Sequence, residues 1–393
     1  THDAALRWLL TELSLENRLR FRHTSMGIYR EGRLHPFDGP RDLLRFDAIS
    51  FPARLRFGLA SLVLAYTPGL EDDDGDSALG WLRRRAGEEA TEAIWEPLFR
   101  SKFGDHAERI PVAWLAGRVR QRYRSRDGVD EKLGYLGGSL QLLVDRLVER
   151  IEAAGGELRL ATPATGLIFE DGGVAGVETG GGPVRGDLIL STVPTPVLGS
   201  LIEDRAPEYA RRLGAIEYMG AICVVLSLTE SLSPVYWLNV ADPGFSFGGV
   251  IEQTRLVPPS EYGGRHVVYL SRYVEADNKL WQMGDDALWE RQRSELARMF
   301  GDRVYEIVHE RHVFRGRYAA PVTDLGFGSR VPTYDAPLES LYVAAMPQVY
   351  PDERSTNNSI RVAAAALAAA GFDVSEVPEG ASLAARHGWR NPP

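Results

Sequence analysis

The residues best suited to bind a ligand lie near the C-terminus, in QVYPDERSTNNSIRVAAAALAAAG at residues 348–371. Four small polar residues, Ser355, Thr356, Asn357 and Asn358, directly precede a run of alanines, and such residues typically cap helices. The first turn of a helix has unpaired backbone N–H groups and the positive end of the dipole, which attract phosphate, carboxylate or an electron-rich carbonyl. The competing interpretation is an ordinary N-cap on a packed helix.

A second set of candidate residues lies on predicted neighbouring strands. The segments PVYWLN, FGGVIEQT and VVYLSRY contain aromatic and polar side chains: Tyr236, Trp237, Asn239, Glu252, Tyr269, Arg272 and Tyr273. Because side chains alternate along a strand, half of them must face inward. They form either a plain aromatic core or a wall that faces a ligand, and the pattern alone leaves both interpretations open.

Other kinds of site have little support. The single cysteine, Cys223, excludes an internal disulfide or a thiolate metal cluster, and the histidines form no ligand set. No serine occupies a G-x-S-x-G elbow. The glycines of VETGGGPVRGDLIL precede a predicted strand instead of following one, so they indicate a hairpin turn and not a phosphate loop. The net charge of −9, without a concentrated basic stripe, argues against a nucleic-acid partner.

The elements that must position these residues fall into successive regions. Residues 1 to about 130 are predicted to be mostly helical, with a hairpin at MGIYREGRLHPF. Residues 134–195 predict one helix and four short strands, the last continuously apolar as in a strand buried on both faces. Residues 205–335 predict antiparallel strands around one helix. A buried strand at 341–345 then leads to the alanine-rich helix, and ligands of open α/β sheets bind at such strand ends.

The sequence has no stretch of the ~20 apolar residues that span a bilayer. Residues 54–66, RLRFGLASLVLAY, predict a core helix, and its basic flanks leave contact with a membrane surface as the alternative. The chain opens directly on an amphipathic helix, THDAALRWLL. With one cysteine and no signal peptide, we expect a cytoplasmic protein.

Three stretches resemble bacterial FAD-dependent oxidoreductases related to protoporphyrinogen oxidase, within the flavin amine oxidase and phytoene desaturase superfamily. They begin GYLGGSLQLLVDRL at residue 134, YWLNVADPGFSFGGVIEQT at residue 236 and DLGFGSRVPTYDAPLES at residue 324. WEPLFRSKFGDHAERIPVAWLAGRV, from residue 95, is similar to the helical region of the same family. The resemblance covers nearly the whole chain and is most specific over residues 235–361.

The resemblance implies an α/β fold with an α+β insertion, namely a split FAD-binding Rossmann-like domain, an antiparallel-sheet substrate domain and a helical subdomain. The implied regions are 1–133 (helical and substrate), 134–200 (FAD-binding, middle part), 201–335 (substrate), 336–375 (FAD-binding, C-terminal part) and 376–393 (tail). The family's N-terminal strand–loop–helix with pyrophosphate-binding glycines has no counterpart here. We therefore expect the chain to start about 50 to 70 residues into the family pattern, as an N-terminally truncated form.

Cofactor contacts follow from the resemblance, position by position. The implied FAD-binding residues lie on the adenine side, at the end of the returning strand, at the last strand end and at the helix start: Pro163, Ala164, Thr192, Val193, Pro194, Ala345, Met346, Asn357, Asn358 and Ser359. Ala164 stands where valine is usual, and Ala345 and Ser355 stand where glycine is common.

The resemblance also implies an activity, the transfer of hydride from a small organic substrate to FAD, with helix N–H groups stabilising the reduced flavin. The predicted substrate-lining residues are Tyr236, Trp237, Asn239, Arg272, Tyr273, Gln348 and Tyr350, and no acid–base residue or metal ligand is predicted. Two alternatives remain. One is a flavin-using isomerase similar to UDP-galactopyranose mutase, and the other is a non-catalytic remnant without a phosphate loop.

Overall fold

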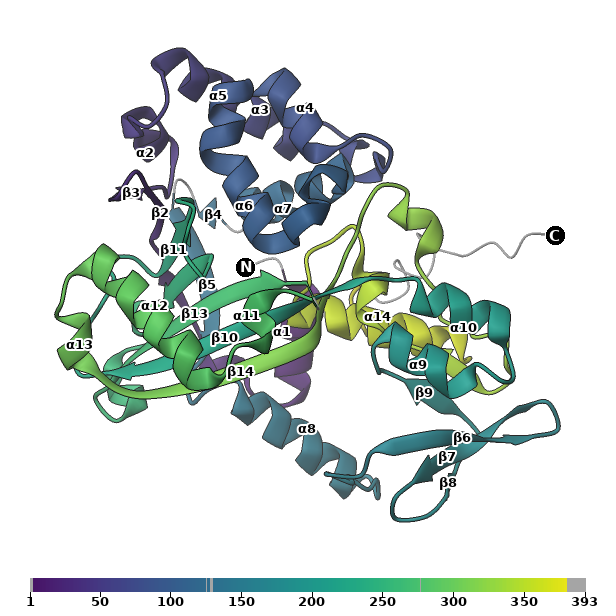
Figure 1. Cartoon of the computed structure of the whole chain (residues 1–393). Coiled ribbons are helices and arrows are strands. Elements are labelled where there is room, and N and C mark those ends of the chain that lie inside the picture. The colour runs from purple at the N-terminus through teal and green to yellow at the C-terminus, as the bar shows by residue number, and fades with distance from the viewer. Residues whose placement is uncertain (1–2, 125, 128–129, 276, 380–393) are drawn as a thin grey trace. The chain divides into compact units, whose positions relative to one another are not determined.

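The computed structural model describes residues 3–124, 126–127, 130–275 and 277–379, which form two compact units. The first unit comprises residues 20–135 and 218–325, and the second comprises the rest of the described chain. Each unit is therefore built from segments that are far apart in the sequence, and helices and sheets are mixed as expected (Figure 1). Most of the predicted tail, residues 380–393, lies outside the described residues.

A seven-stranded sheet forms the centre of the first unit, in the order β14–β10–β13–β12–β11–β2–β3. Its strands are β2 (Met26–Arg30), β3 (Arg33–Pro36), β10 (Tyr218–Leu228), β11 (Trp237–Val240), β12 (Gly249–Glu252), β13 (His266–Val274) and β14 (Val308–Pro321). The predicted hairpin is confirmed: β2 and β3 pair through a turn at Glu31 and Gly32, both with positive φ. The parallel pairing of β2 with β11 was not visible in the sequence.

The two faces of this sheet differ in burial. On one face Val224, Leu226, Val250, Val268 and Leu270 are 0% exposed. They pack against α12 (Asp285–Phe300), the helix drawn along the sheet in Figure 1. On the other face the neighbouring residues of β10 and β13 are only partly buried. Strict alternation along each strand separates these two environments.

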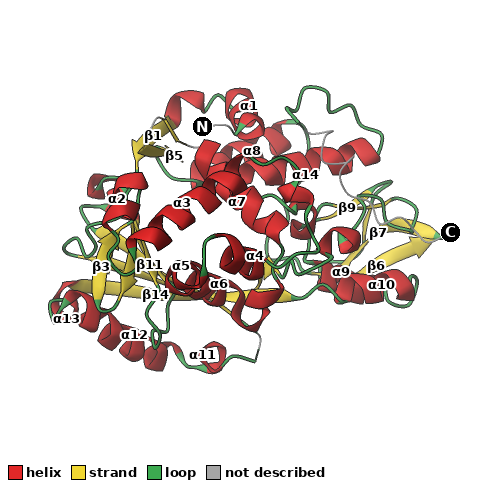
Figure 2. Ribbon diagram, turned by 90° about the horizontal axis from the view of Figure 1, so that it is seen from above, coloured by secondary structure: helices red, strands yellow, loops and turns green. Residues whose placement is uncertain are grey.

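The helical prediction for the N-terminal part of the first unit is confirmed over residues 40–124. The helices are α2 (Pro40–Arg45), α3 (Phe51–Tyr66), α4 (Ala78–Arg85), α5 (Glu88–Ala90), α6 (Glu96–Phe103) and α7 (Val112–Arg124), with a π-helix at Thr91–Trp95 (Figure 2). Aromatic rings hold them together: Trp95 stacks on Phe57 at 5.9 Å, and Trp114 meets Phe103 edge-on at 4.9 Å. A short sheet of β1 (Leu19–His23), β5 (Asp130–Leu136) and β4 (Arg126–Asp127) also forms.

The second unit contains the predicted helix and four strands. These are α8 (Gln141–Ala153), β6 (Ala164–Glu170), β7 (Gly173–Thr179), β8 (Val184–Arg185) and β9 (Ile189–Ser191), followed by α9 (Thr195–Ile202) and α10 (Pro207–Gly214). Strands β6, β7 and β8 form an antiparallel sheet, whereas β9 pairs in parallel with β15 (Leu341–Val343). The alanine-rich helix α14 (Thr356–Ala369) follows β15.

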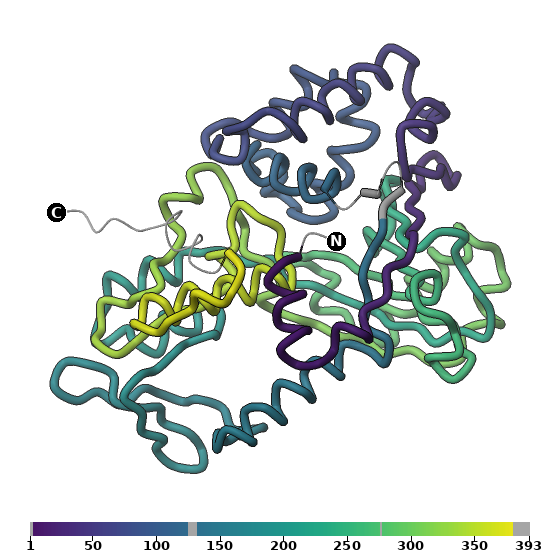
Figure 3. The backbone as a smooth tube through the Cα atoms, turned by 180° about the vertical axis from the view of Figure 1, so that it is seen from behind, coloured from purple at the N-terminus to yellow at the C-terminus, as the bar shows by residue number. Residues whose placement is uncertain are grey.

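The N-terminal helix α1 (Ala4–Glu12) also belongs to the second unit. Figure 3 shows it beside α14, and the backbone N–H of Leu6 donates to Oδ1 of Asn357 at 3.0 Å. Leu10 and Leu13 join a core with Leu143 of α8. The sequence placed α1 in one region with the following 120 or so residues, because local patterns do not reveal this long-range contact. Among the described helices, none combines the length and apolarity needed to cross a membrane.

Two adjacent valines of β10 test the division of the sheet into two faces. Val224→Ala should lower the free energy of unfolding by about 2 kcal/mol, since it opens a cavity in a fully buried layer. Val225→Ala, on the partly exposed face, should cost less than about 1 kcal/mol. Urea unfolding followed by tryptophan fluorescence measures both, and equal losses would contradict the assignment of faces.

Candidate functional site

The carboxyl ends of two parallel strands lie together in the second unit. β9 and β15 pair from Ile189–Leu341 to Ser191–Val343, and the N–H of Ala344 donates to the carbonyl of Ser191 at 2.9 Å. The predicted residues Thr192, Val193 and Pro194 therefore follow one strand, as Ala345 and Met346 follow its neighbour. By contrast, Pro163 and Ala164 are exposed at the start of β6, in the separate antiparallel sheet.

Gln348 holds the end of β15 in place. The side chain is 1% exposed, and its Oε1 accepts the N–H of Ala345 at 2.7 Å. Its Nε2 donates to the carbonyls of Val343 and Thr333, both at 3.1 Å. These bonds use the amide on the protein's own backbone, so contact between Gln348 and a flavin ring stays a prediction. Tyr350, the other predicted lining residue here, is 5% exposed and meets Phe327 edge-on at 5.2 Å.

The start of α14 leaves backbone donors available. The Oγ of Ser355 accepts the N–H of Asn358 at 3.2 Å, and its carbonyl accepts the N–H of Ser359 at 2.9 Å. The N–H groups of Thr356 and Asn357 belong to the first turn and have no acceptor within the helix. These two amides are therefore the donors that the helix end can offer to a ligand, together with the positive end of its dipole.

The asparagine side chains at this helix end bind other parts of the protein. Asn357 accepts the N–H of Leu6, as described above, and Nδ2 of Asn358 donates to the carbonyl of Glu353 at 2.7 Å. Oδ1 of Asn358 accepts from Arg361, which is 7% exposed and pairs with Asp352 at 3.2 Å. The polar side chains thus fix the loop before the helix, while the backbone N–H groups of the first helical turn remain available to bind a ligand.

The alanines of α14 allow close packing. Ala364, Ala365 and Ala366 are at most 4% exposed, and the last two share a core with Val349 and Tyr334. Small side chains bring the helix near the loop that follows β15. Burial raises the pKa of Tyr334 to about 12, so its phenol stays protonated near neutral pH.

A separate group of predicted residues lies on the sheet of the first unit. The pairings place Trp237 beside Ile251 and Tyr269, and they place Asn239 in the next row beside Gly249 and Ser271. Nε1 of Trp237 donates to Oδ1 of Asn239 at 3.0 Å. By alternation Tyr273 shares this face, and the ring of Tyr236, which precedes β11, lies 6.4 Å from that of Trp237. We call this surface of β10–β13 the aromatic face.

Two further tyrosines, Tyr135 and Tyr262, lie beside the aromatic face and were not in the predicted set. Tyr135 of β5 shares a hydrogen bond with Tyr262, and it lies close to Tyr236 and Tyr269. Burial and this bond raise the pKa of Tyr135 well above its ordinary value, and burial also raises the pKa of Tyr269. The phenols therefore remain neutral donors and acceptors. No sequence signal joins Tyr135 to β13, because some 130 residues separate them.

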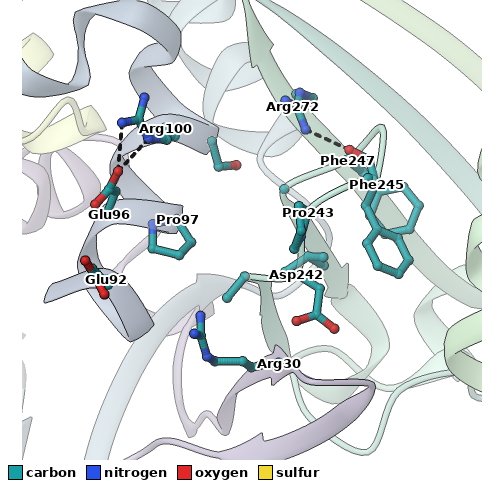
Figure 4. Close-up of a pocket in the computed structure, with 15 residues that line it drawn as sticks. Arg30, Glu92, Glu96, Pro97, Arg100, Asp242, Pro243, Phe245, Phe247 and Arg272 are labelled. Atoms are coloured by element: carbon teal, nitrogen blue, oxygen red, sulfur yellow. Dashed lines mark hydrogen bonds and ion pairs between the residues drawn. The ribbon is translucent and has the colours of Figure 1, made fainter. Parts of the chain in front are cut away.

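Arg272 lies apart from the aromatic face. Arg272 and Tyr273 are adjacent on β13, so their side chains point to opposite faces of the sheet. Nη1 of Arg272 donates to the carbonyl of Phe245 at 2.9 Å. Burial lowers the pKa of Arg272, and Glu295 partly offsets this. The side chain lines a cavity of about 570 Å³ bounded by α6, the π-helix and the loop at residues 241–248 (Figure 4). A role for Arg272 in lining the substrate site stays a prediction, on the opposite side of the sheet from the other candidates.

The acidic groups around this cavity bind neighbouring parts of the first unit. Oδ1 and Oδ2 of Asp242 accept the N–H groups of Glu31 and Gly32 at 2.7 and 2.9 Å, which fixes the β2–β3 turn. Glu96 pairs with Arg83 and Arg100. Glu295 of α12 holds the loop at residues 241–248 in place, because its carboxylate accepts hydrogen bonds from the N–H and the Oγ of Ser246 at 2.7 and 2.6 Å. These bonds give the cavity a stable wall.

Comparison with known proteins agrees with this architecture. The sequence matches the family described as flavin containing amine oxidoreductase over residues 1–345. Among solved structures, a putative protoporphyrinogen oxidase from Exiguobacterium sp. 255-15 is 19% identical, with a TM-score of 0.67, and the match covers 92% of this chain and 83% of that one. An oxidoreductase from Methanosarcina mazei is 16% identical, with a TM-score of 0.69 and coverage of 94% and 85%.

A reduced UDP-galactopyranose mutase has the same fold, with 13% identity, a TM-score of 0.67 and coverage of 97% and 85%. These low identities establish the fold alone. A search of curated proteins finds no match.

The family match defines the class of protein: an FAD-dependent oxidoreductase. The chain belongs to the flavin-containing amine oxidoreductase family, whose model covers residues 1–345 of its 393 residues. The resemblance seen in the sequence is therefore confirmed, as are the expected cofactor and fold class.

The residues of the second unit fit one part of FAD. Two unpaired helix amides follow the end of a buried parallel strand, and they suit the electron-rich carbonyls of a flavin ring. Thr356 and Asn357 would hold that ring edge through their backbones, and the strand ends at Thr192 and Ala345 would lie beside it. The individual FAD contacts remain predictions.

Gln348 can be tested as a structural residue. Gln348→Leu should lower the free energy of unfolding by about 2–3 kcal/mol, because the N–H of Ala345 and the carbonyl of Val343 lose their buried partner. The same substitution at Gln141, exposed at the start of α8, is the matched control and should change stability by less than about 0.5 kcal/mol. Thermal unfolding measures both, and a stable Gln348→Leu variant would contradict the bracing role.

Proposed function

We propose that the enzyme oxidises a small, largely uncharged organic molecule with a flat conjugated or aromatic part, held against the aromatic face. The observation that supports this proposal is the residue composition of the aromatic face. Strands β10–β13, all of them described, contribute Trp237, Asn239, Tyr269 and Tyr273 to it and no charged side chain. These four residues are only partly buried, which suits a wall that meets a ligand better than a sealed core.

The chain's own residues supply binding and orientation. Aromatic rings favour offset or edge-on contact with a flat substrate, which fixes the plane of the ligand. Neutral tyrosine hydroxyls and the amide of Asn239 offer hydrogen bonds that fix its direction. The amides of Thr356 and Asn357 stabilise negative charge at the cofactor's pyrimidine edge. Bound FAD supplies the capacity to accept a hydride from the substrate.

The charge distribution favours this function over that of a sugar-nucleotide mutase. A diphosphate needs positive groups, usually arginines, on the surface that binds it. Strands β10–β13 place none on the aromatic face, and Arg272 points to the other side of the sheet.

A cytoplasmic location also belongs to the proposal. Its support is that the chain has a single cysteine, Cys223, and therefore no internal disulfide, which is compatible with a reducing compartment.

The helix amides can be tested at Thr356. Proline is tolerated at the first position of a helix, and Ser355 already has the extended backbone that must precede it. Thr356→Pro removes one N–H and should weaken FAD binding by the full-length protein about fivefold, ~1 kcal/mol, and lower the flavin reduction potential. Thr356→Ala keeps that N–H and should bind FAD normally. Equal behaviour of the two variants, or no flavin spectrum in the reconstituted wild-type protein, would overturn this assignment.

The substrate wall can be tested with flat conjugated compounds that are uncharged at neutral pH, namely tetrapyrrole esters, polyenes and aromatic amines. Trp237→Ala should raise the substrate Kd about tenfold, ~1.4 kcal/mol, since stacking area is lost. Arg272→Lys, on the other face, should leave the Kd nearly unchanged. Anaerobic flavin reduction measures binding and rate, and aerobic peroxide formation separates oxidation from isomerisation. A sugar nucleotide that turns over only with pre-reduced flavin would instead favour the mutase alternative.

A further inference from the structure

The cavity beside α6 contains an arginine without an acidic partner. Arg272 lines this cavity and is partly buried, and its one hydrogen bond runs from Nη1 to the neutral carbonyl of Phe245. No carboxylate of the described residues forms an ion pair with it. A charge that is taken out of water without a counter-charge costs free energy. The free Nε and Nη2 of Arg272 are therefore donors for an acceptor that enters the cavity.

The acidic residues nearest to Arg272 bind other groups. Oε1 of Glu295 accepts from Nε of Arg291 at 2.9 Å, and its Oε2 binds the loop of the cavity wall, as described above. Oε1 of Glu275 accepts the N–H of Asp105 at 2.8 Å. These carboxylates stabilise the charge of Arg272 from a distance but leave its planar fork of donors open. A carboxylate or phosphate matches such a fork, because it can accept two parallel hydrogen bonds.

An unpaired carboxylate lies on the opposite side of the same cavity. Glu92 is exposed on the π-helix Thr91–Trp95, and Figure 4 shows it across the cavity from Arg272. Within the described part of the chain, its side chain has no hydrogen-bond donor and no ion-pair partner. A π-helical turn is rare, and such turns occur frequently at functional sites. Glu92 is thus placed to accept hydrogen bonds from a cationic group of a ligand.

The other charged residues that line the cavity have partners of their own. Arg100 pairs with Glu96 at 2.7 Å. Arg30 donates to a backbone carbonyl of the π-helix at 3.1 Å and lies 3.8 Å from Glu31. Asp242 binds the β2–β3 turn, as described above. The groups that remain unpaired are therefore one cation on one side of the cavity and one anion on the other.

The size and the remaining lining of the cavity suit a small molecule. Its volume of about 570 Å³ falls within the range of ~300–1,000 Å³ that is usual for small-molecule sites. Apolar side chains supply much of the wall: Pro97, Val240, Ala241, Pro243, Phe245 and Phe247. Because Arg272 points away from the aromatic face, this cavity is separate from the proposed substrate wall.

We propose that the cavity binds an elongated zwitterion, with a carboxylate or phosphate at Arg272, an ammonium group at Glu92 and an apolar chain between them. The ammonium group donates to the carboxylate of Glu92, while the anionic end accepts from the guanidinium group. A ligand with two anionic ends would bring a negative charge to Glu92, and a diamine would bring a positive charge to Arg272. Both are disfavoured by like-charge repulsion, so the arrangement selects opposite charges at the two ends.

Isothermal titration calorimetry of the full-length protein with FAD bound, under anaerobic conditions, tests the proposal with linear amino acids. ε-Aminocaproate should bind with a Kd on the order of 1 mM or below. It should bind at least tenfold more tightly than caproate or hexylamine, because each of these satisfies only one side of the cavity. Aminohexyl phosphate tests the other anionic group, and the tighter of the two zwitterions identifies which one the site prefers.

Variants on the two sides of the cavity should separate the two charges. Glu92→Gln should raise the Kd of ε-aminocaproate about tenfold and leave that of caproate unchanged. Arg272→Gln should weaken both of these ligands about tenfold and leave hexylamine unchanged, whereas Arg272→Lys keeps the charge and should lose about threefold. Glu152→Gln, exposed on α8, and Arg317→Gln, exposed on β14, are the matched controls and should bind like wild type.

Four results would overturn the proposal. They are no saturable binding of either zwitterion, ε-aminocaproate binding no tighter than caproate and hexylamine, adipate binding more tightly than ε-aminocaproate, and Glu92→Gln behaving like the controls. A tenfold loss in Trp237→Ala would instead place the ligand on the aromatic face, which also contradicts the proposal. Circular dichroism checks the fold of Arg272→Gln, which loses its bond to Phe245. Because Glu92 is exposed, its substitution tests the site even if Arg272→Gln unfolds.

Discussion

The strict alternation of side chains along β10–β13 is the constraint on which the first unit depends. On one face, Val224, Leu226, Val250, Val268 and Leu270 form a buried layer against α12, and the residues between them face the aromatic side. A shift of one residue in any of these strands would place tyrosines in the core and leucines on the aromatic face. The packing of the core and the composition of the aromatic face are therefore set by the same register. This also explains why Arg272 and Tyr273, adjacent in sequence, line different surfaces.

In the second unit, the corresponding constraint is that buried polar groups must form hydrogen bonds. The loop between β15 and α14 is largely buried, so its polar groups need partners. Gln348 satisfies the strand end, while Ser355, Asn357 and Asn358 satisfy the loop, the helix start and the N-terminal helix. The amides of Thr356 and Asn357 remain, and they have the polarity that a flavin carbonyl requires. The dense capping at this helix therefore braces the structure and leaves a defined pair of donors.

Local sequence patterns determined much of this protein. Periodicity, turn residues and apolar runs predicted the N-terminal helices, the hairpin at Glu31–Gly32, the four strands after α8 and the buried strand before α14. The resemblance to flavin-dependent oxidoreductases added the cofactor and the family. These features depend on neighbouring residues, so they can be read from a single chain.

Tertiary structure alone decided which candidates share a surface. It brought Tyr135 to Tyr262, joined Leu6 to Asn357, buried Gln348 and separated Arg272 from the aromatic face. Each of these outcomes depends on contacts between residues far apart in the chain or on strand register, and no local pattern encodes them.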